Sequence, residues 1–415
     1  MKPHVLLVFS LRFEESTAML KGVAHYARLH HPWAFFLDGE ARAATDDAWL
    51  RDRKWDGVIS RHTTPAFAGI CAQLKIPLVD LNDTAPFAGV PKIRPDNTAI
   101  GRLGAAHFME RGFRTLGFNG YENEAWSRER RDGFAEAARL AGKKCEVLDV
   151  EYPGDPTPAW EARQTAAISQ WLRRMPRPVA VMACCDMQAQ LVIAAAREAG
   201  LHVPEEVAVL GVNNDTLRCD LGAPPLSSVA TNAFQSGYLA AECLAGLMDG
   251  GLMNGLQPEA GDVRVAPAGV VCRQSTDTFA INDRIVAAAI HHIREHACHG
   301  LTVGQVLRQV YTSRSVLEKK FRAHLKCSPQ TEIRRVQVAK ISQLLQETDF
   351  PLKKIAGLTG FEHVEYLCVV FKRLMGLAPG AYRKQRRQKT GGENGEGQAV
   401  EMAGEAPRRR RRDAR

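Results

Sequence analysis

The sequence predicts an α/β region with two parallel sheets, followed by an all-α region that contains two helix-turn-helix units. From residue 5 to about residue 272, short continuous apolar runs alternate with longer amphipathic stretches. Strands that are apolar throughout are typical of parallel sheets covered by helices on both faces. In the last third, two segments repeat the pattern of a short amphipathic helix, a tight turn and a second amphipathic helix.

The expected elements of the α/β region alternate along the chain. Strands are expected at residues 5–9, 34–37, 57–59, 78–81, 116–120, 179–183 and 207–212. Helices are expected, from apolar side chains at helical spacing, at residues 18–29, 96–111, 134–140 and 187–198. The first apolar run is too short for a signal peptide, and no stretch approaches the roughly 18 apolar residues of a membrane span.

Composition limits the class of protein. The chain has 55 Lys and Arg residues against 46 Asp and Glu, a formal net charge of +9, which suits a polyanionic partner such as nucleic acid. Its ten cysteines are scattered, so we expect reduced thiols in a cytoplasmic protein and no metal site. No glycine-rich phosphate loop or nucleophile elbow occurs, so we expect neither an enzyme nor a cofactor. The polar segment 387–415 is expected to be a disordered basic tail.

Polar side chains follow the expected strands, where ligands bind in folds of this kind. A flat ring can stack on the C–H face of a sugar, while arginine, carboxylate and amide groups pair with its hydroxyls. Any one of these residues could instead cap the next helix, but the set together favours a polyhydroxylated ligand. The ligand-binding candidates are Trp126, Arg128, Arg130, Asp186, Asn213 and Asn214.

This region resembles the LacI-type and periplasmic sugar-binding family. Residues 127–134, Ser-Arg-Glu-Arg-Arg-Asp-Gly-Phe, match its Ser-x-x-Arg-x-x-Gly-Phe segment, which implies that Arg130 contacts a sugar. Residues 94–97 and 225–229 are similar to the family's crossovers between two lobes. The resemblance therefore implies a two-lobed, periplasmic-binding-protein-like sensor domain. Where the family has Gly-Phe-Asp-Asp this chain has Gly-Val-Asn-Asn, so Asn213 lacks the charge that strengthens hydrogen bonds.

Each helix-turn-helix unit carries local end signals. Thr302 and Gln305 fit a capping box, and Ser313 can cap the next helix. Ser328 and Pro329 should begin a helical rod of about 27 Å between the units, long enough to place two recognition helices about one DNA turn apart. The side chains expected to face inward on the second helices are Leu317, Phe321 and Leu325, then Leu367, Phe371 and Leu374.

Residues 283–384 resemble the AraC/XylS DNA-binding domain, with Ile355-Ala356, Gly360-Phe361, Phe371-Lys372, Gly376, Pro379 and Tyr382-Arg383 as its signature. The candidate DNA-binding residues are Arg314, Ser315, Glu318, Lys319 and Arg322 on one helix, and His363, Val364, Glu365 and Lys372 on the other. By resemblance, the base-contacting positions of the second helix include two valines, Val364 and Val369. We therefore expect less hydrogen-bond readout there, with contact to thymine methyl groups.

Residues 292–296, His-Ile-Arg-Glu-His, match a metalloprotease pattern. Zinc catalysis would also require a third ligand and a substrate cleft. The alternative is an amphipathic first helix of the DNA-binding domain, with Ile285, Ala289 and Ile293 buried. We favour the helix.

The order of the two modules resembles that of XylR-like transcriptional regulators. The resemblance implies a sensor over residues 1–272, a linker over 273–282 and a DNA-binding domain over 283–386. It also implies a cytoplasmic homodimer that binds promoter DNA, responds to a sugar such as D-xylose, contacts RNA polymerase and activates genes of pentose use. Two alternatives stay open: a regulator controlled by a non-sugar ligand or a partner protein, and a sugar-binding protein or enzyme with an attached interaction module.

Overall fold

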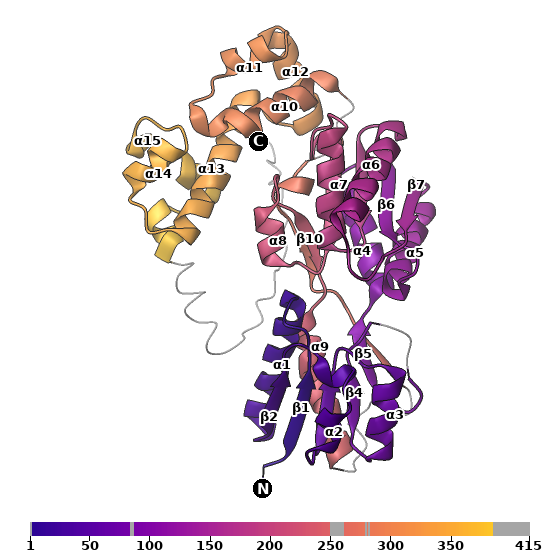
Figure 1. Cartoon of the computed structure of the whole chain (residues 1–415). Coiled ribbons are helices and arrows are strands. Elements are labelled where there is room, and N and C mark those ends of the chain that lie inside the picture. The colour runs from indigo at the N-terminus through magenta and orange to yellow at the C-terminus, as the bar shows by residue number, and fades with distance from the viewer. Residues whose placement is uncertain (1, 84–86, 250–260, 279, 281–282, 385–415) are drawn as a thin grey trace, which may run out of the picture. The chain divides into compact units, whose positions relative to one another are not determined.

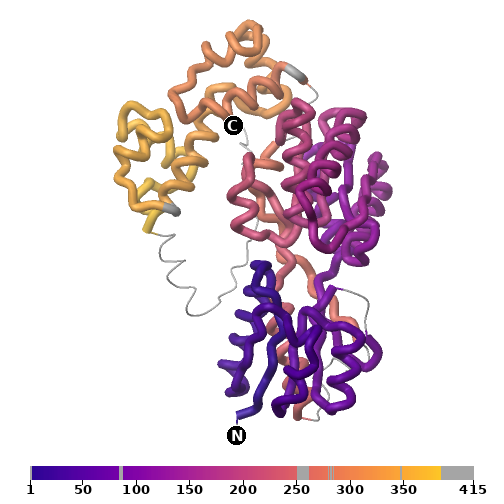
Figure 2. The backbone as a smooth tube through the Cα atoms, in the orientation of Figure 1, coloured from indigo at the N-terminus to yellow at the C-terminus, as the bar shows by residue number. Residues whose placement is uncertain are grey.

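The computed structural model describes residues 2–83, 87–249, 261–278, 280 and 283–384. The chain divides into two compact units at residue 287. The first unit is the expected α/β region with two sheets, and the second is the expected all-α region (Figures 1 and 2). The predicted tail, 387–415, lies outside the described residues. None of the helices in the described part of the chain is long and apolar enough to cross a bilayer.

The first lobe of unit 1 is built on a wholly parallel sheet with the strand order β11-β5-β4-β3-β1-β2. Its strands are β1 (His4–Val8), β2 (Ala34–Asp38), β3 (Gly57–Ser60), β4 (Leu78–Asp80), β5 (Lys92–Pro95) and β11 (Asp262–Val265). One apolar core lies between this sheet and the helices α1 (Glu14–His30) and α9 (Ala233–Met248). A second core fills the other face, beneath α2 (Ala48–Arg51) and α3 (Pro65–Gln73).

The second lobe has the strand order β12-β10-β9-β8-β6-β7, in which only β12 is antiparallel to its neighbour. Its strands are β6 (Thr115–Tyr121), β7 (Lys144–Val150), β8 (Val179–Ala183), β9 (Val207–Val212), β10 (Ser227–Ala230) and β12 (Gly269–Val271). Its helices are α4 (Asn97–Glu110), α5 (Ala125–Leu140), α6 (Pro158–Arg174), α7 (Asp186–Glu198) and α8 (Thr216–Leu221). Apolar cores lie on both faces of the sheet.

The chain crosses between the lobes after β5, after β10 and between β11 and β12 (Figure 1). The third crossing was not predicted, because β11 and β12 are short. Helix α5 begins at Ala125, well before the predicted residue 134, and it packs against α4 at very close range. A Cβ atom on Gly101 would lie 2.0 Å from the carbonyl oxygen of Arg130, so glycine is required there. This contact fixes the height of Arg130 above the sheet.

Part of the predicted linker 273–282 is packed on the second lobe. Ser275 and Thr276, in the short helix η3 (Gln274–Thr276), are fully buried. The Ser275 hydroxyl donates to the carbonyl of Val209 at 2.6 Å, and the Ala280 amide donates to the carbonyl of Arg111 at 2.9 Å. The stretch up to Ala280 is therefore anchored to the sensor region.

Unit 2 consists of α10 (Arg284–His296), η4 (Ala297–His299), α11 (Val303–Gln309), α12 (Arg314–Leu325), α13 (Pro329–Glu347), α14 (Leu352–Leu358) and α15 (Val364–Met375). Helices α11 and α12 form the first helix-turn-helix unit, α14 and α15 form the second, and α13 is the rod between them. The predicted caps are confirmed: Thr302 and Gln305 form a capping box, and Ser313 and Ser328 accept from the amides of Val316 and Thr331.

The interiors of both helix-turn-helix units are largely as predicted. Leu317, Phe321 and Leu367 are fully buried, as is Phe371. The prediction for Leu374 is wrong, because its side chain is 45% exposed. It lies in the last turn of α15, beyond the core that the shorter α14 can cover. Leu325, at the same place in α12, is half-buried.

Candidate functional site

A cavity of about 310 Å³ lies between the two lobes, at the carboxyl ends of both sheets. This volume is at the lower end of the range of roughly 300–1,000 Å³ for small-molecule sites. The first lobe contributes Phe13, Glu14, Glu15, Arg61, His62, Asn82 and Asp83. The second lobe contributes Tyr121, Glu124, Trp126, Arg130, Tyr152, Cys185, Asp186, Met187, Asn213, Asp215 and Arg218. We call this space the inter-lobe cavity.

Not all of the candidate ligand-binding residues line the inter-lobe cavity. Trp126, Arg130, Asp186 and Asn213 do. Arg128 and Asn214 are not among the lining residues. Arg128 is two positions before Arg130 and so lies on a different face of α5. It donates to the carbonyl of Glu122 at 2.5 Å. The side-chain oxygen of Asn214 accepts from Arg273 at 2.9 Å.

Arg130 is the most restrained of the cavity groups, with 3% of its surface exposed. Its Nε donates to Asn97 Oδ1 at 2.8 Å, and its Nη1 donates to the carbonyl of Cys184 at 2.7 Å. Its guanidinium carbon lies 4.9 Å from the centre of the Trp126 ring, a cation–π distance. These contacts hold the fork of the guanidinium in one orientation, as recognition of a hydroxyl pair requires.

Asp186 occupies the first position of α7 and is almost fully buried. Its two carboxylate oxygens accept from the Ser228 hydroxyl at 2.6 Å and from the Asp215 amide at 2.8 Å. Gly211 in β9 leaves room for it, because a Cβ atom there would lie 2.2 Å from Asp186 Oδ1. Burial raises the pKa of Asp186 to about 7 despite the hydrogen bonds from Ser228 and Asp215.

Asn213 and Asn214 both have left-handed backbone conformations, with φ of 101° and 52°. Asparagine tolerates such angles better than most residues. The Asn213 amide donates to the carbonyl of Val229 at 2.9 Å, and its Oδ1 lies 3.4 Å from Arg130 Nη1. The turn therefore directs the Asn213 side chain into the cavity and that of Asn214 away from it.

The first lobe contributes a partly buried ion pair between Glu15 and Arg61. Glu15 also accepts from the Thr231 hydroxyl at 2.8 Å. Burial alone would raise the pKa of Glu15, but Arg61, Thr231 and Arg130 together lower it below its ordinary value. Glu15 is therefore an ionised acceptor at neutral pH.

A chain of polar groups connects the lobes beside the cavity. Asn97 accepts from Arg130 of the second lobe and donates to Asp83 of the first at 3.0 Å. Burial raises the pKa of Asp83 above its ordinary value, although Arg130 and Asn97 oppose the shift. Next to this chain, Arg94 in β5 pairs with Glu129 in α5 at 2.8 Å. These contacts couple the spacing of the lobes to the groups that face the cavity.

The first-lobe residues Glu15, Arg61 and Asp83 were missed from the sequence. Arg61 directly follows β3, and Asp83 comes shortly after β4. Polar residues after apolar runs were the signal that led to Asp186 and Asn213. The same signal marks Arg61 and Asp83, because they follow the apolar runs of β3 and β4.

The first recognition helix, α12, presents a polar surface. Lys319 and Arg322 are exposed, and Arg314 Nε pairs with Glu318 Oε1 at 3.0 Å on the outer face. Ser315 is exposed near the start of the helix, its Oγ 3.2 Å from Ser313 Oγ. All of the candidate side chains on α12 except the partly covered Glu318 are therefore accessible.

The second recognition helix, α15, presents a more apolar surface. His363 precedes it, and Glu365 and Lys372 are exposed, whereas Val364 is half-buried. Val369 is 63% exposed, so its side chain is accessible. The two recognition helices thus differ in chemistry as the sequence predicts.

The His-Ile-Arg-Glu-His segment lies in α10, whose Ala289 and Ile293 are fully buried and whose Ile285 is half-buried. The segment therefore lies in an amphipathic helix whose apolar face is buried. Within the described residues, no group of three or more His, Cys, Asp or Glu side chains is placed to hold a metal ion.

Comparison with known proteins agrees with this architecture. Residues 105–276 match a periplasmic binding protein-like domain, and residues 306–385 match a helix-turn-helix domain. The xylose operon regulatory protein of Escherichia coli K12 is 30% identical over 390 residues, which cover 92% of this chain and 96% of that protein. The protein of the same name from Haemophilus influenzae is 28% identical over 389 residues, or 91% of this chain and 97% of that protein.

Among solved structures, one described as the xylose-binding transcription activator xylR superposes with a TM-score of 0.75 at 27% identity. The match covers 93% of this chain and 98% of that structure. Both modules and their order are thus common to this chain and its relatives, which are transcriptional regulators and not enzymes. The chain belongs to the family of xylose operon regulatory proteins.

Proposed function

We propose that this protein is a cytoplasmic, D-xylose-responsive transcriptional activator that acts as a homodimer. The relatives of this chain, a xylose operon regulatory protein and a xylose-binding transcription activator, support D-xylose as the first candidate ligand. They also support promoter DNA as the macromolecular partner. Contact with RNA polymerase would follow from activation.

The observation that carries the sugar proposal is the composition of the inter-lobe cavity. Arg130 and Arg61 supply donors, while Asp186, Glu15 and Asn213 supply acceptors. A sugar hydroxyl both donates and accepts, so it can pair with groups of either kind. The aromatic lining residues, Phe13, Tyr121, Trp126 and Tyr152, offer apolar surface for the sugar's C–H groups. A hydrophobic ligand would displace water from the charged and polar groups of the cavity without replacing the hydrogen bonds to that water, at a cost in free energy.

We assign the response to closure of the lobes around the sugar. The cavity groups come from both lobes, so a ligand makes its full set of contacts only when the lobes are close together. Differential affinity of this kind is what shifts a conformational equilibrium. We propose residues 1–272 as the sensor, 273–282 as the linker and 283–386 as the DNA-binding domain. The packed stretch up to Ala280 would transmit lobe movement along the chain to α10.

We assign DNA recognition to the exposed side chains of α12 and α15. Arg314, Ser315, Lys319 and Arg322 would contact bases and phosphates, with Glu318 placed to accept from cytosine. On α15, His363, Glu365 and Lys372 would frame an apolar strip that includes Val364 and suits thymine methyl groups. The first helix-turn-helix unit would thus carry more of the sequence specificity.

Isothermal titration calorimetry of the full chain with D-xylose, other pentoses and hexoses tests the sugar proposal. We expect D-xylose to bind, and Arg130→Ala to weaken it by about 10- to 100-fold, since hydrogen bonds to charged groups contribute about 1.5–3 kcal/mol. Arg128→Ala is the matched control on the same helix and should bind as the wild type does.

The melting temperature of each variant without ligand separates lost binding from lost folding. The sugar assignment fails if no sugar binds the wild type, or if a folded Arg130→Ala variant retains full affinity. Binding of promoter DNA without a response to any sugar would favour control by another ligand or by a partner protein.

A further inference from the structure

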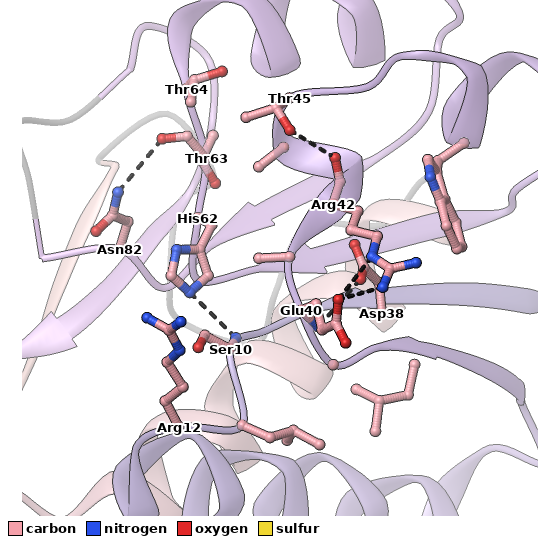
Figure 3. Close-up of a pocket in the computed structure, with 16 residues that line it drawn as sticks. Ser10, Arg12, Asp38, Glu40, Arg42, Thr45, His62, Thr63, Thr64 and Asn82 are labelled. Carbon is pink, nitrogen blue, oxygen red and sulfur yellow. Dashed lines mark hydrogen bonds and ion pairs between the residues drawn. The ribbon is translucent and has the colours of Figure 1, made fainter. Parts of the chain in front are cut away.

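A second cavity, of about 1330 Å³ (Figure 3), shares two lining residues with the inter-lobe cavity. Every residue that lines it belongs to the first lobe, between Ser10 and Asn82. It surrounds the carboxyl ends of β1, β2 and β3, so it is independent of the second lobe. His62 and Asn82 line both cavities. A ligand that extends past these two side chains would therefore reach from one cavity into the other.

Thr63 marks this cavity as a polar site with an unused group. Its side chain is 3% exposed, and its Oγ1 is buried without a hydrogen-bond partner in the described part of the chain. Leaving a buried hydroxyl unpaired costs roughly 1–3 kcal/mol. Thr63 lines the cavity, so rotation of its side chain about χ1 would turn the hydroxyl toward a ligand there, and a ligand hydroxyl would supply the missing partner.

Two donors add to Thr63. The Arg12 guanidinium is exposed and has no acceptor among the described residues. His62 Nε2 accepts from the Ser10 amide at 3.2 Å. The neutral ring therefore carries its proton on Nδ1, which is left to donate. Burial keeps the pKa of His62 below its ordinary value, which favours this neutral form.

The charges that line the cavity argue against an anionic ligand. Asp38 is buried and accepts from the Ala43 amide at 2.7 Å, and Glu40 pairs with Arg42. The two carboxylates, Asp38 and Glu40, offset the two guanidinium groups, Arg12 and Arg42, so the lining has no net positive charge to attract an anion. A neutral ligand with many hydroxyls suits both the donors and the acceptors. Trp49 also lines the cavity and offers a ring for the C–H face of a sugar.

We propose that this second cavity is a carbohydrate subsite that receives a second sugar unit, joined to the one in the inter-lobe cavity. The sensor would then accept a disaccharide as well as a monosaccharide. The inference rests on the proposed sugar-binding function of the inter-lobe cavity. Because the subsite belongs to one lobe only, it would add affinity and selectivity for longer sugars without opposing lobe closure.

Calorimetric titration of the full chain with D-xylose and with xylobiose, its β-1,4-linked disaccharide, tests the subsite. We expect Thr63→Val to weaken xylobiose binding by roughly threefold to tenfold, and Arg12→Ala by tenfold or more, since neutral and charge-assisted hydrogen bonds differ in this way. D-Xylose binding should change by less than about twofold in both variants. Arg28→Ala, an exposed arginine of the first lobe outside both cavities, is the matched control.

The subsite is rejected if the wild type binds D-xylose but not xylobiose. It is also rejected if either variant binds xylobiose as the wild type does, or loses affinity for both sugars equally. Failure of the wild type to bind any sugar is a different result, because it removes the proposed function itself. Melting curves without ligand verify that Thr63→Val and Arg12→Ala remain folded.

Discussion

A buried side-chain amide on α13 bridges the two helix-turn-helix units by hydrogen bonds. Gln337, in the middle of α13, is 1% exposed. Its Nε2 donates to two backbone carbonyls, each at 2.9 Å. One belongs to Ala297, just before the first helix-turn-helix unit, and the other to Thr359, at the end of α14 in the second. Nearby, a Cβ atom on Gly360 would lie 2.6 Å from the Gly300 amide nitrogen, so the two backbones nearly touch. Gln337 therefore helps to set the spacing of the recognition helices.

Replacing Gln337 with leucine keeps most of the volume but removes both donors. Each buried carbonyl left without a donor costs roughly 1–3 kcal/mol, so we expect a total loss of about 2–6 kcal/mol. For a mid-range loss of about 4 kcal/mol and a denaturant slope of about 2 kcal/mol/M, the urea midpoint of this domain should fall by on the order of 2 M. Gln343→Leu, at an exposed position of the same helix, is the control and should leave the midpoint nearly unchanged.

The functional consequence can be measured by fluorescence anisotropy with two promoter duplexes. One has the natural site, and the other has about five extra base pairs, half a turn, between the two half-sites. The wild type should strongly prefer the natural duplex, because α12 and α15 are held at a fixed spacing. Gln337→Leu should bind the natural duplex more weakly and discriminate less between the two. If the folded variant discriminates as sharply as the wild type, the amide does not set the spacing.

Three further results are expected. Because burial raises the pKa of Asp186 from its ordinary 3.8 to about 7, its protonated form stabilises the fold below about pH 4, and this contribution is lost as the pH rises through about 7. The unfolding free energy of the wild type relative to Asp186→Asn should therefore fall by up to about 4 kcal/mol from pH 4 to pH 8, and a constant difference in urea titrations would contradict the shift. Gly360→Ala should lower the melting temperature, since φ is 72° and a Cβ would meet Gly300, whereas Gly357→Ala, with open space around it, should raise it slightly. Lys319→Ala should weaken specific promoter binding by about 1–3 kcal/mol in a gel-shift assay, and unchanged affinity would remove it from the interface.

The features that the sequence predicted best are local ones. The caps at Thr302, Ser313 and Ser328 depend on residues three positions apart, so the pattern alone determines them. The parallel strands were recognisable because each is buried on both faces and is apolar throughout. The start of α5 was missed because its first two turns carry Arg128 and Arg130 rather than an apolar stripe. Functional residues broke the pattern that defines a helix.

Side-chain direction around the inter-lobe cavity was beyond the sequence. Asn213 and Asn214 are adjacent and chemically identical, and only the left-handed turn decides which one faces the cavity. The pairing of Glu15 with Arg61 depends on the sheet bringing the ends of β1 and β3 together. Such contacts follow from the strand order, which apolar runs do not specify.

The first-lobe residues matter because a response needs more than affinity. The predicted residues that line the cavity, Trp126, Arg130, Asp186 and Asn213, all belong to the second lobe. By themselves they would bind a sugar equally well with the lobes open or closed, and equal affinity shifts no equilibrium.

Moving the lobes from one part closed in a hundred to nearly all closed requires about 5.5 kcal/mol of differential binding. Hydrogen bonds to charged groups contribute about 1.5–3 kcal/mol each, so about two to four such bonds, formed only on closure, are sufficient. The partly buried first-lobe charges that line the inter-lobe cavity are Glu15, Arg61 and Asp83. By contrast, the direct contact of Glu14 with the Thr216 hydroxyl is exposed and contributes little on its own. In the proposed mechanism the sugar, bound between charges of both lobes, would therefore supply the binding energy that favours the closed state.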